Sequence, residues 1–209
     1  MNTDTLFDDM DVSRETIERL ELHVLLLKKW SKAINLVSKS TLDAAWERHV
    51  LDSVQLWSLI PESANRIVDL GSGAGFPGLV LAIAARDHAP SREVFLVESD
   101  RRKAAFLREV VRETGVSASV LVERAESLTI TADVVTARGF AGLDTLLGIA
   151  QPIMGENGIA LLHKGARYES ELTDAAKNWH METDIHQSRI DPASAILRIH
   201  GVSRRQDGK

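Results

Sequence analysis

The chain has 209 residues, 44% hydrophobic and 26% charged, which is ordinary for a globular protein and predicts one sizeable domain or one domain with an appendage. It contains no cysteine, which excludes disulfides, thiolate metal sites and a cysteine nucleophile. The net charge of −5 is already carried by the first 21 residues, with seven acids against two bases, so the rest of the chain is balanced. The acidic sum therefore does not exclude a nucleic-acid partner.

The N-terminal sequence lacks an apolar stretch behind a basic start, and the longest apolar runs, such as residues 79–85, are far too short to cross a bilayer. We expect a cytoplasmic protein without a membrane partner. The seven histidines are scattered without ligand spacing, so no metal site is predicted.

Two helical segments are predicted before residue 60. The first begins at Ser13, a suitable N-cap residue. Its apolar stripe follows helical spacing and comprises Ile17, Leu20, Val24, Leu27 and Ile34. The second is expected over about 41–59, where Pro61 follows as a stop signal. Its inner face is expected to carry Trp46, Val50, Val54 and Trp57.

From residue 66, short β-rich runs alternate with helical stretches. The expected parallel strands are 67–70, 93–97, 119–123, 133–137 and 158–164, and the terminal strand pair is 182–188 and 195–201. The expected helices are one opening at Pro77 and those over about 101–113, 143–150 and 168–178. This alternation is typical of an α/β fold with a doubly wound, mostly parallel sheet.

The sequence RIVDLGSGAGFPG, residues 66–78, places a dense glycine turn directly after a buried strand. Its glycines are Gly71, Gly73, Gly75 and Gly78. Such a turn between a strand and a helix lets main chain approach a ligand closely. Gly73 to Gly78 matches GxGxxG, and Glu98 follows at the spacing of a dinucleotide site. The turn alone leaves open a dinucleotide, a nucleoside such as S-adenosylmethionine, or no ligand.

Acidic residues near the turn favour the cationic nucleoside. Asp69 ends the first strand, where it would repel a pyrophosphate but attract a sulfonium and an ammonium group, directly or through water. Glu98 ends the second strand and can accept ribose hydroxyls from either ligand. Glu126 follows the third strand, where an adenine ring is expected, although a solvated loop carboxylate is an equal alternative. Phe76 is expected beside the cofactor or in the core.

The turn is one of six blocks that together resemble a known family. In chain order they are WSKAINLVS (30–38), RHVLDS (48–53), DLGSGAGFPGLVLAI (69–83), RKAAFL (102–107), TARGFA (136–141) and LLHKG (161–165). They are similar to the landmarks of the bacterial 16S ribosomal RNA guanine-N7 methyltransferases, historically called glucose-inhibited division protein B. Six ordered blocks are far more specific than one glycine motif.

The resemblance implies a class I S-adenosylmethionine-dependent methyltransferase fold, Rossmann-like with a mostly parallel seven-stranded sheet, over residues 63–209. An N-terminal helical extension over 1–62 would precede it. The implied cofactor is S-adenosylmethionine, and the implied substrate is one loop guanine of 16S ribosomal RNA, free or in the small ribosomal subunit particle. A monomer is implied. The family's cofactor positions carry over to Gly71, Phe76, Ala125, Glu126 and Arg138; the residue arguments add Asp69, Gly73, Gly75 and Glu98.

Guanine N7 carries a lone pair and no proton, so its methylation needs no general base, and positioning can contribute about 7–11 kcal/mol. The lack of a Ser/His/Asp set fits this chemistry. Arg138 and Lys164 end the fourth and fifth strands and are the predicted catalytic residues. Arg138 is expected to contact O6, a phosphate or the cofactor carboxylate, and Lys164 a phosphate or the base. Two surface cations are the alternative.

The target guanine must lie in a loop or outside the stack, because side chains scarcely reach the major groove of an A-form helix. Predicted RNA contacts are Asn35, Arg48, His49, Arg101, Arg102 and Lys103. For Arg48, an i, i+4 ion pair with Asp52 is the alternative. The basic run from Arg101 can follow a phosphate backbone or be a solvated face.

Three other functions stay open on the sequence alone. The same turn would serve a NAD(P)-dependent oxidoreductase. A methyltransferase could act on a protein or a small molecule instead of RNA. A cofactor-free interaction module is the third.

Overall fold

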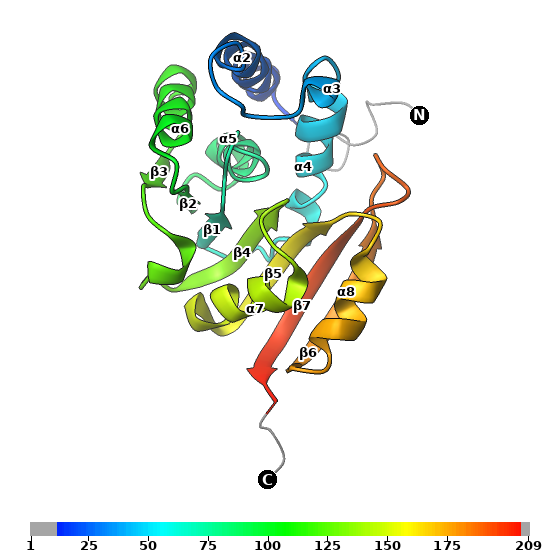
Figure 1. The fold of residues 1–209 in the computed structure, drawn as a ribbon. Helices are drawn as coiled ribbons and strands as arrows, with labels where there is room; N and C mark the ends of the chain where they lie inside the picture. The colour runs from blue at the N-terminus through cyan, green and yellow to red at the C-terminus, as the bar shows by residue number, and fades with distance from the viewer. Residues whose placement is uncertain (1–11, 206–209) are drawn as a thin grey trace.

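In the computed structural model, residues 12–205 are described, and they build one twisted seven-stranded sheet with helices on both faces (Figure 1). The strands are β1 Arg66–Leu70, β2 Glu93–Val97, β3 Ala118–Leu121, β4 Ala132–Arg138, β5 Met154–Lys164, β6 Trp179–Gln187 and β7 Ala195–Arg204. Their order is β3-β2-β1-β4-β5-β7-β6. Strand β7 pairs antiparallel with both β5 and β6, and the other neighbouring strands pair in parallel. The predicted doubly wound sheet and terminal strand pair are therefore confirmed.

The sheet is buried between two helical layers. Helices α5 (Gly78–His88) and α6 (Arg101–Thr114) cover one face, and α7 (Leu143–Ala150) and α8 (Tyr168–Ala175) lie on the other (Figure 1). Along β1 the side chains alternate between two apolar cores, because successive residues of a strand point to opposite faces. Burial on both faces explains why the central strands read as continuous apolar runs.

Helix α2 (Arg14–Trp30) lies across α5 and α6. Ser13 is its N-cap, as predicted, and accepts a hydrogen bond from the Thr16 amide at 3.0 Å. The predicted stripe is only partly correct, because the helix ends before Ile34 and two of the other positions are half-buried. The buried face is Thr16, Leu20, His23, Leu26 and Leu27. The buried face includes the polar residue His23 at its centre, so it differs from the stripe predicted from apolar residues alone.

The single helix predicted over 41–59 is wrong. The chain instead forms α3 (Lys39–Leu42), a π-helical turn (Trp46–Leu51), α4 (Asp52–Val54) and a 3₁₀ turn (Trp57–Leu59). Val50 and Val54 are buried, as predicted. At this break, Asp52 makes polar contacts with Arg138 on β4 and His163 on β5. The spacing of apolar residues in the sequence does not predict such contacts.

The segments before β1 share a core with the sheet. Leu20 and Leu27 of α2 and Val50 of the π-helical turn belong to the same buried cluster as Phe106 of α6. The expected boundary near residue 62 stays a prediction, and residues 1–11 of the expected extension lie outside the described residues. No helix within residues 12–205 has the length and apolarity needed to cross a membrane.

Candidate functional site

The glycine turn begins at the carboxyl end of β1. Gly71, Gly73 and Gly75 have φ of 65°, 54° and 85°, in the left-handed region that strains other L residues. A Cβ at Gly71 would overlap the ring of Phe140. The missing side chain at Gly71 therefore lets the Phe140 ring pack directly on the turn.

Asp69 lies beneath the turn with no exposed surface. Its Oδ2 accepts a hydrogen bond from the Gly78 amide at 3.2 Å, and its Oδ1 accepts one from the Thr136 hydroxyl at 2.8 Å. Burial raises the pKa of Asp69 to about 6, against the opposing hydrogen bonds from Ser72, Thr136 and Gly78. The carboxylate is fully enclosed, so the turn and β4 hold it in place and it is not presented to solvent.

Glu98 fastens the turn to the end of β2. One carboxylate oxygen accepts the Gly73 amide at 2.9 Å and the other accepts the Asp100 amide at 2.8 Å. Two main-chain donors of the turn, those of Gly73 and Gly78, are thus taken by carboxylates of the protein.

A hollow of about 220 Å³ opens beside the turn, at the carboxyl ends of the central strands. We call it the β2–β4 hollow. Its wall consists of Gly71, Val97, Glu98, Ser99, Lys103, Glu123, Arg124, Ala125, Glu126, Gly139 and Phe140. The structure therefore brings together Gly71, Glu98, Ala125 and Glu126, as the sequence predicts for cofactor residues. Lys103 also belongs to this wall, and its predicted contact with RNA stays a prediction.

Sequence analysis missed Phe140 as a wall residue of the β2–β4 hollow, although it lies inside the TARGFA block. Other predicted cofactor residues do not form this wall: Asp69, Gly73, Gly75, Phe76 and Arg138. Gly73 contributes its amide to Glu98, and Gly75 makes room for Leu79, so both shape the turn from below.

Phe76 packs in the core. Its ring stacks with those of His23 and His49, with centroid distances of 4.6 and 5.0 Å. The Arg138 guanidinium lies 5.1 Å from the ring centroid, within cation–π range. His23 also bonds the Ala74 carbonyl through Nε2 at 2.8 Å, so α2 supports the turn from behind. Burial lowers the pKa of both histidines to about 4.

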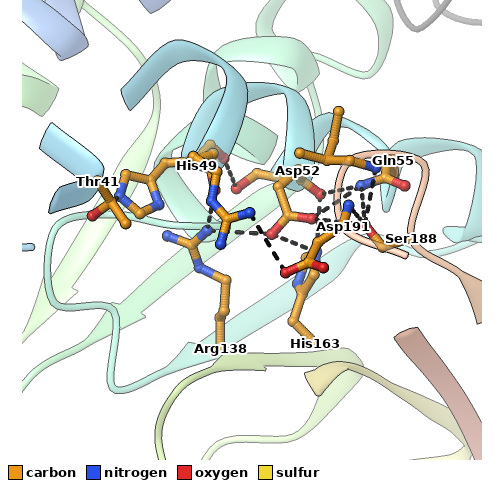
Figure 2. Close-up of polar contacts among 11 residues, drawn as sticks. Thr41, His49, Asp52, Gln55, Arg138, His163, Ser188 and Asp191 are labelled. Atoms are coloured by element: carbon orange, nitrogen blue, oxygen red, sulfur yellow. Dashed lines mark hydrogen bonds and ion pairs between the residues drawn. The ribbon is translucent and has the colours of Figure 1, made fainter. Parts of the chain in front are cut away.

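Arg138 lies at the end of β4 and points toward the segments that precede the sheet (Figure 2). Its Nη1 donates to the Arg48 carbonyl at 3.2 Å and lies 3.4 Å from Oδ2 of Asp52. Asp52 is thus the counter-charge of Arg138, and the predicted Arg48–Asp52 pair is wrong. Arg48 instead lies 3.5 Å from Asp191.

Asp52 gathers further partners from two other parts of the fold (Figure 2). Its Oδ1 accepts hydrogen bonds from Gln55 at 3.1 Å and from Ser188, in the β6–β7 connection, at 3.3 Å. The Nε2 of His163 on β5 lies 2.9 Å from the Asp52 carbonyl. One aspartate therefore joins β4, β5 and the β6–β7 connection to the N-terminal segments.

Lys164 ends β5 and is only 8% exposed. Its Nζ lies 2.5 Å from Oε2 of Glu171 on α8 and donates to the Ala141 carbonyl at 2.9 Å. The same Oε2 accepts the Leu143 amide at 2.8 Å. The alternative of two surface cations is wrong for Lys164 and for Arg138, whose side chain is 19% exposed.

A second hollow of about 620 Å³, which we call the β5–α8 hollow, lies next to this pair. Its wall consists of Gly139, Phe140, Ala141, Gly142, His163, Lys164, Gly165, Ala166, Arg167, Ser170, Glu171 and Asp174. The two hollows share Gly139 and Phe140.

The remaining predicted RNA contacts differ in exposure. Asn35, Arg101 and Arg102 are exposed, and the Arg48 side chain is 46% exposed. Arg102 lies 3.5 Å from Asp100, the N-cap residue of α6. His49 is buried and its Nε2 lies 3.0 Å from the Thr41 hydroxyl oxygen. Within residues 12–205, no cluster of three or more His, Asp or Glu side chains is arranged to hold a metal ion.

A model of the family described as rRNA small subunit methyltransferase G (GidB) matches residues 16–193. The chain belongs to this family. The match covers α2 from Thr16 onward, the glycine turn and every block that carried the resemblance in the sequence.

Relatives within the rRNA small subunit methyltransferase G family match nearly the whole chain. The ribosomal RNA small subunit methyltransferase G of Rhodospirillum centenum is 51% identical over 93% of this chain and 88% of its own length. The protein of the same name from Paramagnetospirillum magneticum is 50% identical over 98% of each chain.

Solved structures with low sequence identity share the fold of this family member. An S-adenosylhomocysteine-bound methyltransferase from Podospora anserina, PaMTH1, has a TM-score of 0.59 at 15% identity and covers 90% of this chain and 88% of its own. A ribosomal protein L11 methylase from Lactobacillus delbrueckii subsp. bulgaricus has a TM-score of 0.58 at 14% identity, over 76% of this chain and 79% of its own. The class I methyltransferase fold predicted from the sequence is confirmed.

Proposed function

We propose that the protein transfers a methyl group from S-adenosylmethionine to N7 of a loop guanine in 16S ribosomal RNA. Family membership and relatives named as small subunit ribosomal RNA methyltransferases support the reaction and the type of RNA. The choice of guanine N7 comes from the resemblance of the six sequence blocks.

The β2–β4 hollow fits the methyl donor. Gly71 presents bare main chain, Glu98 can accept ribose hydroxyls with its remaining lone pairs, and Ala125 and Glu126 stand where adenine is expected. The wall holds three carboxylates, those of Glu98, Glu123 and Glu126, against two cations, those of Lys103 and Arg124. Its formal charge is negative, which suits a cationic nucleoside. When bound, the donor supplies an electrophilic methyl group on a sulfonium.

The hydrogen bonds of the turn's main-chain amides favour S-adenosylmethionine over a dinucleotide as the ligand. A dinucleotide site leaves helix N-terminal amides free for its pyrophosphate. Here Gly78 donates to Asp69 and Gly73 donates to Glu98, so both amides already face negative charge. The same contacts disfavour a NAD(P)-dependent oxidoreductase.

Positioning carries the reaction, because the N7 lone pair attacks without deprotonation. Lys164 holds the Ala141 carbonyl in the loop that the two hollows share. Arg138 ties the end of β4 to Arg48 and Asp52 in the segments before the sheet. The two predicted catalytic residues are thus proposed to position the loop and the N-terminal segments around the acceptor.

The exposed predicted contacts, Asn35, Arg48, Arg101 and Arg102, are proposed to bind RNA phosphates, which fits their solvent-facing positions. We further propose a cytoplasmic monomer that acts on free 16S RNA or on the small subunit particle. We propose that its helical extension ends at residue 62 and that the methyltransferase domain begins at residue 63.

Mass mapping of 16S RNA from a strain without the protein tests the acceptor. One N7-methylguanine should disappear and return with the wild-type gene, but not with Glu98→Gln, which replaces one acceptor oxygen by a donor. Retention of every N7-methylguanine would overturn the acceptor. A thermal-shift series tests the donor separately: stabilisation by NAD(P) and not by S-adenosylmethionine or S-adenosylhomocysteine would overturn the methyltransferase proposal.

A further inference from the structure

The β5–α8 hollow carries a hydrogen-bond donor and an acceptor side by side. Nζ of Lys164 and Oε2 of Glu171 are 2.5 Å apart, and both side chains form the wall of the hollow. We propose that this pair recognises the target base by its O6 and N1–H groups and so selects guanine over adenine. The inference rests on the proposed function and assigns the base-binding part of that site.

Each partner keeps unused hydrogen-bonding capacity. The Lys164 ammonium has three N–H donors, of which one serves the Ala141 carbonyl and one serves Glu171. Oε2 of Glu171 is taken by Lys164 and by the Leu143 amide, while Oε1 has no partner within residues 12–205. A free donor and a free carboxylate oxygen therefore lie next to each other in a hollow.

That order of groups complements guanine. Its O6 accepts and the adjacent N1–H donates, so O6 can take the third Lys164 proton while N1–H bonds Oε1 of Glu171. Adenine has the reverse order, an N6 amino donor beside an N1 acceptor, and would set donor against donor and acceptor against acceptor. Unpaired buried polar groups on both partners make such a mismatch costly.

The same pose leaves the reactive atom accessible. N7 lies on the other flank of O6 from N1, so a base held through O6 and N1–H has no side chain of this pair on N7. The wall of the hollow at Gly139 and Phe140 is shared with the β2–β4 hollow, where the methyl donor is proposed to bind. The geometry thus combines recognition of one edge of the base with methylation at another.

The pair also has a supporting role, since Glu171 holds Leu143 and Lys164 holds Ala141. Loss of that support would slow methylation of every base alike. Recognition predicts a change in the preference between two bases. The test therefore compares two acceptors that keep N7 and the 2-amino group and differ only at O6 and N1.

Ligated 16S RNA with guanine or 2,6-diaminopurine at the target position, assembled into small subunit particles, supplies these acceptors. Methyl transfer from labelled S-adenosylmethionine is measured as kcat/KM on each. The wild type should prefer guanine by about ten- to a hundredfold, as expected for lost charged hydrogen bonds. Glu171→Gln replaces one carboxylate oxygen, an acceptor, by an amide NH2 group, a donor. This variant should reduce the preference for guanine over 2,6-diaminopurine at least about tenfold. Glu169→Gln, on the exposed face of the same helix, should keep it.

Three results would overturn the inference. One is equal use of both bases by the wild type, which needs no variant and is independent of how Glu171→Gln folds. Another is an unchanged preference in a folded Glu171→Gln with both rates reduced in parallel, which would leave only the supporting role. Failure of the wild type to methylate the guanine particle at all would instead overturn the proposed function, and this inference with it.

Discussion

Arg138 and Asp52 connect the end of β4 to the segments before the sheet, with Nη1 of the arginine 3.4 Å from Oδ2 of the aspartate. Their side chains are only 19% and 15% exposed, so each charge depends on the other for compensation. Burial lowers the pKa of Arg138, and the nearby Asp52 carboxylate opposes that shift. The pair therefore stabilises the charged form of a guanidinium that covers Phe76 under the glycine turn.

Asp52→Ala should strongly destabilise the protein, because it leaves the Arg138 charge buried without a partner and also removes the acceptor for Gln55 and Ser188. Breaking a buried pair in this way costs about 3–5 kcal/mol. Asp191→Ala is the matched control, because it removes an arginine partner whose side chain is 46% exposed and should cost about 0–1 kcal/mol. Urea unfolding of both variants checks the difference, and equal losses would contradict the role of Asp52.

The fold could be predicted largely because its central strands, such as β1 and β4, are buried on both faces. Runs such as 94–97 are apolar throughout, so the strand and its neighbouring helix are visible in local composition. The break in the N-terminal segments was not predictable, because Asp52 is drawn into contacts with Arg138 and Ser188, far away in sequence. The spacing of apolar residues indicates which side chains are buried, but it does not predict which polar groups contact each other in the fold.

In the candidate site, too, some features could be predicted from the sequence and others depend on contacts between distant segments. Gly71, Glu98 and Glu126 follow three parallel strands, so their convergence at one edge follows from the fold class. The contact of Phe140 with Gly71 depends on how the loop after β4 bends. Pairing of Lys164 with Glu171 depends on the placement of α8, which in sequence is one more charged helix. No spacing rule reports either contact.

Gly71→Ala should displace Phe140, because the added Cβ would overlap its ring. Gly139→Ala is the matched control: its φ of 62° is close to the 65° of Gly71, but an added Cβ meets nothing within 4 Å. Both substitutions cost about 1–2 kcal/mol in backbone strain, so any excess loss at Gly71 measures the clash. Thermal unfolding without ligand should show Gly71→Ala to be the less stable variant. Equal melting temperatures would show that the ring moves aside freely.

Asp69 should make the protein less stable as pH rises from about 4 to 6. Burial raises its pKa from 3.8 to about 6, so in that window the unfolded chain has lost a proton that the folded protein still holds. The sign follows: stability is fully present below 3.8 and falls by up to about 3 kcal/mol as pH passes the folded value. Asp69→Asn removes this titration. The difference in unfolding free energy between the wild type and Asp69→Asn should move in favour of the variant across pH 4 to 7, and a constant difference would refute the assignment.

His23 should make the protein more stable as pH rises from about 4 to 6.5, which is the opposite of the effect of Asp69. Burial lowers its pKa from 6.5 to about 4, partly offset by its bond to the Ala74 carbonyl, so the folded protein holds it neutral while the unfolded chain takes up a proton. Stability from this group is present above pH 6.5 and is lost as pH falls toward 4, by about 1.4 kcal/mol for each pH unit. His23→Gln keeps an N–H donor for Ala74 but does not titrate. Its unfolding free energy should gain on the wild type as pH falls from 6.5 to 4 and stay at a fixed offset above pH 7. Parallel curves through the acidic range would mean that His23 titrates alike in the folded protein and in the unfolded chain, and would refute the assignment.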